Sequence, residues 1–100
     1  MEYLVTLTTV PPAGTSEAEI EAVRAREAER DAALAAEGKL LRLWRPPLQP
    51  GEWKALGLWQ AESEAELREA IATLALYPWF AAIEIVPLTP HPADPARQHV

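Results

Sequence analysis

The chain has 100 residues and a formal net charge of −6. This length allows one domain with one core, and the acidic balance argues against nucleic-acid binding, which needs a basic face. The absence of cysteine excludes disulfides, thiolate metal sites and a cysteine nucleophile.

The sequence also disfavours a metal-binding protein and a membrane or exported protein. The only histidines are His91 and His99, too few for a histidine zinc site, so we expect no metal. No apolar run approaches the roughly 20 residues that span a bilayer. Residues 1–5 do not have the pattern of a signal peptide. We therefore expect a cytoplasmic protein with no membrane partner.

The first half of the chain predicts a strand, a helix and a second strand. Residues 2–10 are rich in Tyr, Leu, Val and Thr and end at two prolines, which is typical of a strand. Residues 16–19 form a capping box, so we expect a helix from there to about residue 37. Gly38 is placed to end it in a left-handed conformation. Residues 39–45 predict the second strand.

The second half repeats this order after a proline-rich connector at residues 46–51. Residues 53–61 and 80–86 predict strands, and the capping box at residues 63–66 begins a helix between them. The order predicts an α+β, ferredoxin-like βαββαβ fold with one four-stranded antiparallel sheet. We expect a single domain over residues 1–88 and a Pro-rich C-terminal tail over residues 89–100.

The tryptophans predict a subunit interface. Strand alternation places Trp44, Trp53 and Trp59 on one face of the sheet and leucines on the other. The Trp-bearing face either points away from the helices or covers them and leaves the leucines outside. Either outer face is too apolar to remain in water on so small a protein. We therefore expect self-association, and predict that it uses the Trp-bearing side.

The first helix carries a carboxylate inside its apolar stripe. At about 100° per residue, Glu27 lies in line with Ile20 and Leu34, seven residues away on either side. Glu27 is therefore expected to be buried or to face a cavity. Arg24 lies three residues before it and Asp31 one turn after it, so an ion pair at the stripe edge is one interpretation. The other is a general base whose pKa is raised by burial and lowered by Arg24.

Three stretches resemble the muconolactone Δ-isomerase family. The segment from Val23 to Gly38, continuing into Leu43-Trp44-Arg45, is similar to that family's helix-to-strand segment, including its LWR ending. Residues 76–80 (LYPWF) followed by IEI at residues 83–85 resemble a second segment. The pair at residues 91–92 resembles a third. The resemblance covers nearly the whole chain in the same order.

The resemblance implies a fold, an assembly and an activity. The fold is ferredoxin-like with dimeric α+β barrel association, dimers assemble into decamers in the family, and pockets form between subunits. The activity is a cofactor-free isomerisation in aromatic catabolism that turns muconolactone into the enol-lactone of 3-oxoadipate. Glu27 falls on the family's acid/base carboxylate, Arg45 on the arginine of LWR, and Arg24 where the family usually has lysine. The last difference and the proline-rich connector allow a related lactone instead.

The chemistry suggests a role for each site residue. Removing a proton beside an unsaturated lactone gives a dienolate, which needs a base, a stabilised oxygen and exclusion of water. The expected catalytic residues are Glu27, as proton shuttle, and Arg24, beside the oxyanion. The expected substrate-binding residues are Arg45, clamping a carboxylate, Trp44 (or Trp59) as an apolar wall, and His91, brought to a pocket mouth by a neighbouring subunit's tail.

Less specific interpretations of these residues stay open. Arg45 before a proline fits a solvated charge, the tryptophans fit an interface core, and His91 fits an exposed tail residue. The alternative function is a non-catalytic small-ligand-binding or assembly module of the dimeric α+β barrel type, because fold alone does not decide function. A cofactor-free oxygenase or cyclase of similar fold is a third, for which no motif is present.

Overall fold

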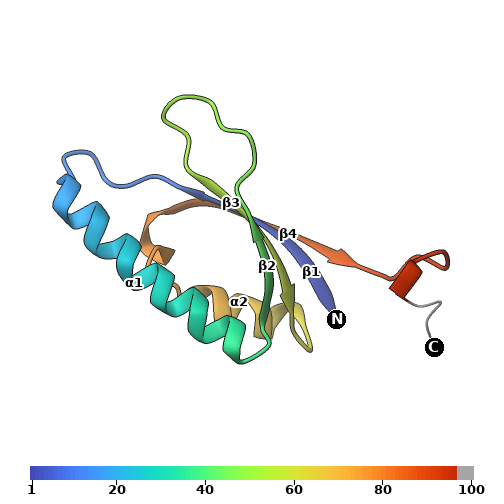
Figure 1. Cartoon of the computed structure of the whole chain (residues 1–100). Coiled ribbons are helices and arrows are strands. Elements are labelled where there is room, and N and C mark those ends of the chain that lie inside the picture. The colour runs from blue at the N-terminus through green and yellow to red at the C-terminus, as the bar shows by residue number, and fades with distance from the viewer. Residues whose placement is uncertain (97–100) are drawn as a thin grey trace.

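The computed structural model describes residues 1–96 and contains one sheet with two helices packed on it (Figure 1). Its elements are, in chain order, β1 (Glu2–Thr9), α1 (Glu17–Ala36), β2 (Leu40–Trp44), β3 (Lys54–Gln60), α2 (Glu64–Ala72), the 3₁₀ turn η1 (Tyr77–Trp79) and β4 (Phe80–Leu88). This order confirms the predicted ferredoxin-like βαββαβ fold.

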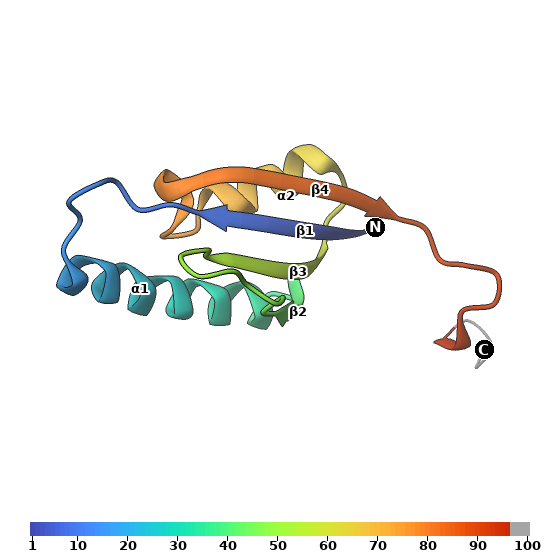
Figure 2. The same ribbon diagram turned by 90° about the horizontal axis from the view of Figure 1, so that it is seen from above.

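The sheet has the strand order β2-β3-β1-β4, and all neighbouring strands are antiparallel (Figure 2). In the central part, Val5 of β1 lies opposite Gly57 of β3 and Ile85 of β4. Pro87 stands opposite Tyr3. A proline is tolerated there because β4 is an edge strand and its missing amide costs no ladder hydrogen bond.

Both predicted helix starts are confirmed. The side chain of Ser16 accepts a hydrogen bond of 3.1 Å from the amide of Glu19, and Ser63 does the same for Glu66 at 3.1 Å. Each satisfies an amide that has no partner within the helix. Gly38 follows the end of α1 with φ of 76°, the left-handed conformation that ends many helices.

The core lies between the helices and the inner face of the sheet. Leu34 of α1 and Leu67 and Ile71 of α2 are almost fully buried there, against Val5 and Trp59 of the sheet. Burying one such large apolar side chain stabilises the fold by about 1.5–3 kcal/mol. Both helices are therefore fixed on one face, and residues 1–96 leave the other face without a covering helix.

The prediction that the three tryptophans share one face is wrong. Trp59 is 1% exposed and belongs to the core under the helices. Trp44 pairs with Leu56 on the opposite face and is 39% exposed. The register shifts between Leu40 and Arg42, and an extra residue in one strand reverses the alternation of side chains beyond it. The outer face therefore carries the β3 leucines together with Trp44.

The C-terminal segment leaves the body of the molecule after β4 (Figures 1 and 2). It makes a local turn in which the amide of Ala93 donates to His91 Nδ1 at 2.9 Å. Residues 97–100, with His99, lie outside the described residues. Within residues 1–96, neither helix combines the length and the apolar character needed to cross a membrane.

Candidate active site

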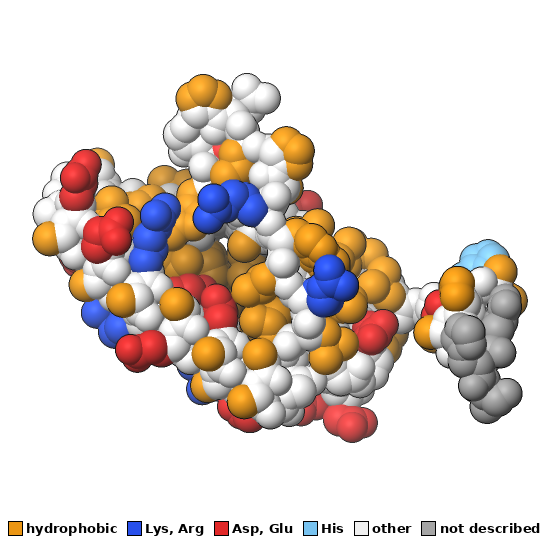
Figure 3. All heavy atoms as spheres, viewed as in Figure 1, with side chains coloured by type: hydrophobic (Ala, Val, Ile, Leu, Met, Phe, Trp, Pro, Cys, Tyr) orange, Lys and Arg blue, Asp and Glu red, His pale blue; other side chains and the backbone are white. Residues whose placement is uncertain are grey.

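A cavity of about 570 Å³ lies between α1 and the β2–β3 side of the sheet. In the space-filling view it is a hollow with acidic and basic side chains around it (Figure 3). Its charged lining residues are Arg24, Glu27, Asp31, Arg45, Glu52 and Lys54.

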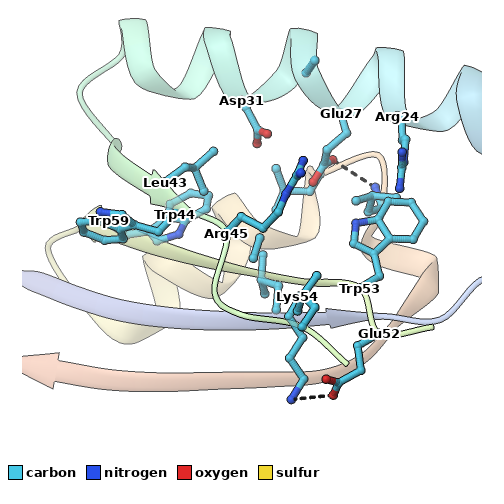
Figure 4. A pocket seen from close by; sticks show the side chains of 16 residues that line it. Arg24, Glu27, Asp31, Leu43, Trp44, Arg45, Glu52, Trp53, Lys54 and Trp59 are labelled. Carbon is cyan, nitrogen blue, oxygen red and sulfur yellow. Dashed lines mark hydrogen bonds and ion pairs between the residues drawn. The ribbon is translucent and has the colours of Figure 1, made fainter. Parts of the chain in front are cut away.

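Helix α1 crosses this cavity between two apolar anchors. Val23 and Leu34 are 5% and 0% exposed and lie at either side of the gap, and Leu34 belongs to the core that contains the sheet residues Val5 and Trp59. Glu27 and Asp31 lie between them on successive turns and line the cavity (Figure 4). The stripe that holds the helix in place therefore also fixes the direction of both carboxylates.

Glu27 is half-buried and receives hydrogen bonds from the backbone. The amide of Leu76 donates to its Oε1 at 3.1 Å. Burial raises the pKa of Glu27, and hydrogen bonds from the backbone of Leu76 and Ala75 oppose that rise. Arg24 and Glu27 form no ion pair within the part of the chain that the structure describes. The sequence predicted that Arg24 would lower the pKa of Glu27; in the structure the backbone hydrogen bonds lower it instead.

Asp31 lies in the same wall but lacks such donors. Burial, followed by the nearby charge of Glu27, raises the pKa of Asp31 to about 6. Among residues 1–96, its carboxylate accepts no hydrogen bond. A half-buried carboxyl without donors favours its protonated form more than one that accepts amide hydrogen bonds.

Arg24 packs against an aromatic ring instead of a carboxylate. Its guanidinium carbon lies 4.5 Å from the ring centroid of Trp53, a cation–π contact. The carbonyl of Trp53 accepts a hydrogen bond of 2.8 Å from the amide of Thr9. Side chain and backbone contacts together hold Trp53 as one wall of the cavity (Figure 4).

The β2–β3 connector supplies a cation and a closed turn at the mouth. Arg45 directly follows β2 and lines the cavity beside Trp44. The amide of Gln49 donates to Glu52 Oε1 at 2.7 Å, and Glu52 pairs with Lys54 at 3.5 Å. Since Glu52 is engaged by these partners, Arg45 remains available to bind an anionic group.

The Trp59 side chain lines the cavity and also carries a buried donor. Its Nε1 is buried and has no hydrogen-bond partner among the described residues. The indole lies across Gly57, where an added Cβ would come within 2.8 Å of Nε1, so only glycine fits. Buried donors without partners are rare in folded proteins; this one lies against Gly57 and is enclosed by the protein.

The structure brings four of the five predicted site residues to one cavity: Arg24, Glu27, Trp44 and Arg45. His91 lies in a separate shallow hollow beside Leu88, on the segment that leaves the body. Nothing within residues 1–96 brings it to the cavity.

Among the charged and aromatic lining residues, four were not predicted as site residues: Asp31, Glu52, Trp53 and Lys54. Asp31 could have been found, because it lies eleven residues, about three helical turns, after Ile20 and so shares the apolar stripe. Trp53 was assigned to an interface, and Trp59 both to that interface and, as an alternative to Trp44, to the apolar wall of the site. Within residues 1–96, no group of three or more His, Cys, Asp or Glu is placed to hold a metal.

The fold and this cavity define a small ferredoxin-like α+β protein that acts on a small molecule. The family described as muconolactone delta-isomerase matches residues 1–94, and the chain therefore belongs to that family. No curated protein matches the sequence.

Solved structures agree on the fold. A muconolactone isomerase is similar at 27% identity with a TM-score of 0.79, covering 93% of each chain. A 5-chloro-2-hydroxyhydroquinone dehydrochlorinase from Burkholderia phenoliruptrix, solved with 2,5-dihydroxybenzoquinone, is 19% identical with a TM-score of 0.65, covering 89% of this chain and 94% of that one. The cofactor-independent oxygenase SnoaB from Streptomyces nogalater is 20% identical with a TM-score of 0.51, covering 92% and 96%. The last two likenesses concern the fold alone.

Proposed function

We propose that the protein is a cofactor-free isomerase that shifts the C=C bond of a lactone by proton transfer, with muconolactone or a related lactone as substrate. The observation that carries this proposal is Glu27, a half-buried carboxylate with a raised pKa on the wall of a cavity. Such a group holds and releases protons closer to neutral pH than an exposed glutamate does. Family membership supports the same class of reaction.

Glu27 is the proposed base. It takes the proton from the ring carbon, and the electron pair spreads through the lactone to its carbonyl oxygen as a dienolate. The hydrogen bond from Leu76 to Oε1 holds the carboxyl in one orientation, and its other oxygen is left for the substrate. Fixed orientation removes an entropic cost from the reaction.

Arg45 and Arg24 are the proposed cationic partners. Arg45 binds the substrate's carboxylate side chain, since a guanidinium donates two parallel hydrogen bonds to a carboxylate. Arg24 stabilises the enolate oxygen, and its stack on Trp53 restricts the directions from which it does so. Trp44 borders the same mouth, while its ring lies on the outer face, where the guanidinium carbon of Arg42 is 5.0 Å from the ring centroid.

Self-association is part of the proposal, through the outer face of the sheet. There Leu4, Leu56 and Leu58 lie in register with Trp44 and Val86. Val86 is 51% and Trp44 39% exposed in the single chain. An apolar sheet face of this kind is typically covered in the native protein. A neighbouring subunit's tail would then bring His91 to the cavity mouth.

The experiment that tests the function is an ultraviolet assay of muconolactone isomerisation by the purified protein. Turnover that depends on Glu27 supports the isomerase. A protein that binds the lactone without converting it supports the alternative, a non-catalytic small-ligand-binding module.

A further inference from the structure

The cavity wall of α1 carries a second carboxyl group that the mechanism above does not use. Asp31 lies one turn beyond Glu27, half-buried, and lines the same cavity (Figure 4). Side chains four residues apart on a helix have Cβ atoms about 5–6 Å apart. Two carboxyl groups at that spacing can reach two different carbons of one bound lactone ring.

The two carboxyl groups have different surroundings. Glu27 accepts a hydrogen bond of 3.1 Å from the amide of Leu76, which stabilises its ionised form. Asp31 accepts no hydrogen bond within residues 1–96 and faces the negative charge of Glu27. When environments separate two neighbouring carboxyl groups in this way, one serves as base and the other as acid.

The other charged groups around the cavity do not remove this asymmetry. They are Arg24 on α1, Arg45 at the end of β2, and Glu52 and Lys54 at the start of β3. Arg24 stacks on Trp53 and Glu52 pairs with Lys54, and among the described residues none of the cations forms an ion pair with Asp31. The segment after α2 contributes only Leu74 and Leu76.

We propose that Asp31 is a second catalytic group, the acid that delivers the proton to the lactone carbon, while Glu27 is the base that removes one. This rests on the proposed function. The C–H bond at the first carbon breaks, its proton goes to Glu27, and its electron pair enters the dienolate. The O–H bond of Asp31 then breaks and a C–H bond forms two carbons away. The proton on Glu27 returns to Asp31 through solvent, so each turnover starts from the same state.

Asp31→Asn and the matched control Glu29→Gln test this division. Glu29 lies on α1, is exposed and does not line the cavity. We expect kcat for muconolactone to fall about 100-fold or more in Asp31→Asn and to be unchanged in Glu29→Gln. Wild-type kcat should fall as the pH rises above about 6, and this limb should be missing in Asp31→Asn. Wild-type kcat and pH profile in Asp31→Asn would overturn the proposal.

The hydrogen source gives a second readout. In D₂O, an acid that exchanges with solvent puts deuterium on the accepting carbon at essentially every turnover, whereas a single shuttling carboxylate carries part of the substrate's own hydrogen across. We therefore expect full deuteration by wild type and retained protium in the residual turnover of Asp31→Asn. Substantial protium transfer by wild type would contradict the two-carboxyl division.

A carboxyl NMR titration separates failure of this proposal from failure of the substrate assignment. We expect Asp31 to titrate near pH 6 in wild type and at lower pH in Glu27→Gln, which lacks the neighbouring charge. If the lactone is not converted but Asp31 behaves in this way, the proposed substrate fails and the coupled pair stands. If Asp31 titrates as an ordinary aspartate in wild type, the division of roles is overturned for any substrate.

Discussion

The amide of Leu76 donates a 3.1 Å hydrogen bond to Oε1 of Glu27, joining residues that lie 49 positions apart in the sequence. It connects the segment after α2 to the middle of α1 at the edge of the cavity. Half-burial and this hydrogen bond act on the pKa of Glu27 in opposite directions, with burial the larger effect. The candidate base is therefore positioned by a contact from another part of the fold as well as by its own helix.

The carboxyl pair should make stability depend on pH. The folded-state pKa of Asp31 is raised from 3.8 to about 6, so the folded protein holds this proton more tightly than the unfolded chain does. Ionised Asp31 therefore destabilises the fold, and the free energy of unfolding falls as the pH rises from about 4 to about 6. Because the group is only half-buried, the loss is on the order of 1 kcal/mol after solvent screening.

Urea denaturation of wild type and Asp31→Asn at several pH values checks this. The variant should be more stable than wild type at pH 7, and the difference should vanish below pH 4. Glu29→Gln, which changes an exposed carboxylate on the same helix, should show no such trend. A difference that grows toward low pH would have the wrong sign for this account.

Arg45→Ala should raise KM with little change in kcat, because a clamp on a remote carboxylate acts alike on ground and transition states. Losing a hydrogen-bonded charge contact costs about 1.5–3 kcal/mol, so KM should rise about tenfold or more. Steady-state kinetics on muconolactone measure both parameters. Arg26→Ala is the control, since Arg26 is exposed on α1 away from the cavity. An unchanged KM in Arg45→Ala would show that Arg45 is a solvated charge that does not bind the substrate.

Val86→Asp should dissociate the assembly without unfolding the subunit. Val86 lies on the outer sheet face and is 51% exposed in the single chain, so the subunit tolerates a charge that an apolar interface does not. Val10, 58% exposed just beyond β1, provides the control Val10→Asp. Light scattering at micromolar concentration measures the mass of the assembly in wild type and in both variants. A wild-type protein that is already monomeric would contradict association through this face.

Truncation after Leu88 should weaken assembly or activity. The segment from residue 89 leaves the body of this chain, and its prolines restrict the unfolded chain, so docking on a neighbour loses little entropy. Light scattering and lactone turnover of the truncated protein are compared with those of His91→Ala, which keeps the segment. If truncation changes neither property, the tail contributes to neither the interface nor the cavity.

Local sequence rules predicted most of the fold because they concern neighbouring residues. Ser16 and Ser63 cap their helices as expected, and the position of Glu27 in the helical stripe predicted its place at a cavity. The predicted assignment of side chains to the two sheet faces fails at Leu41. A register shift depends on how β2 pairs with β3 and cannot be predicted from alternation in one strand.

The surroundings of the candidate site could not be predicted from the sequence, because they also depend on how distant elements pack together. The Leu76 amide, the Arg24–Trp53 stack and the unpaired Trp59 N–H arise from elements that meet only in the folded chain. The predicted roles of Arg24, Arg45, Trp44 and His91 stay predictions. The helical periodicity that identified Glu27 could also have identified Asp31.

Turnover of muconolactone by Glu27→Gln, beside wild type and Glu29→Gln, tests the central claim most directly. Glutamine keeps the shape of the side chain and removes a half-buried charge, so the variant should fold with unchanged or higher Tm. General acid/base groups contribute about 10²- to 10⁴-fold. The account therefore predicts that ultraviolet absorbance shows kcat at least about 100-fold lower in Glu27→Gln and unchanged in Glu29→Gln. Equal turnover in wild type and a folded Glu27→Gln would contradict it.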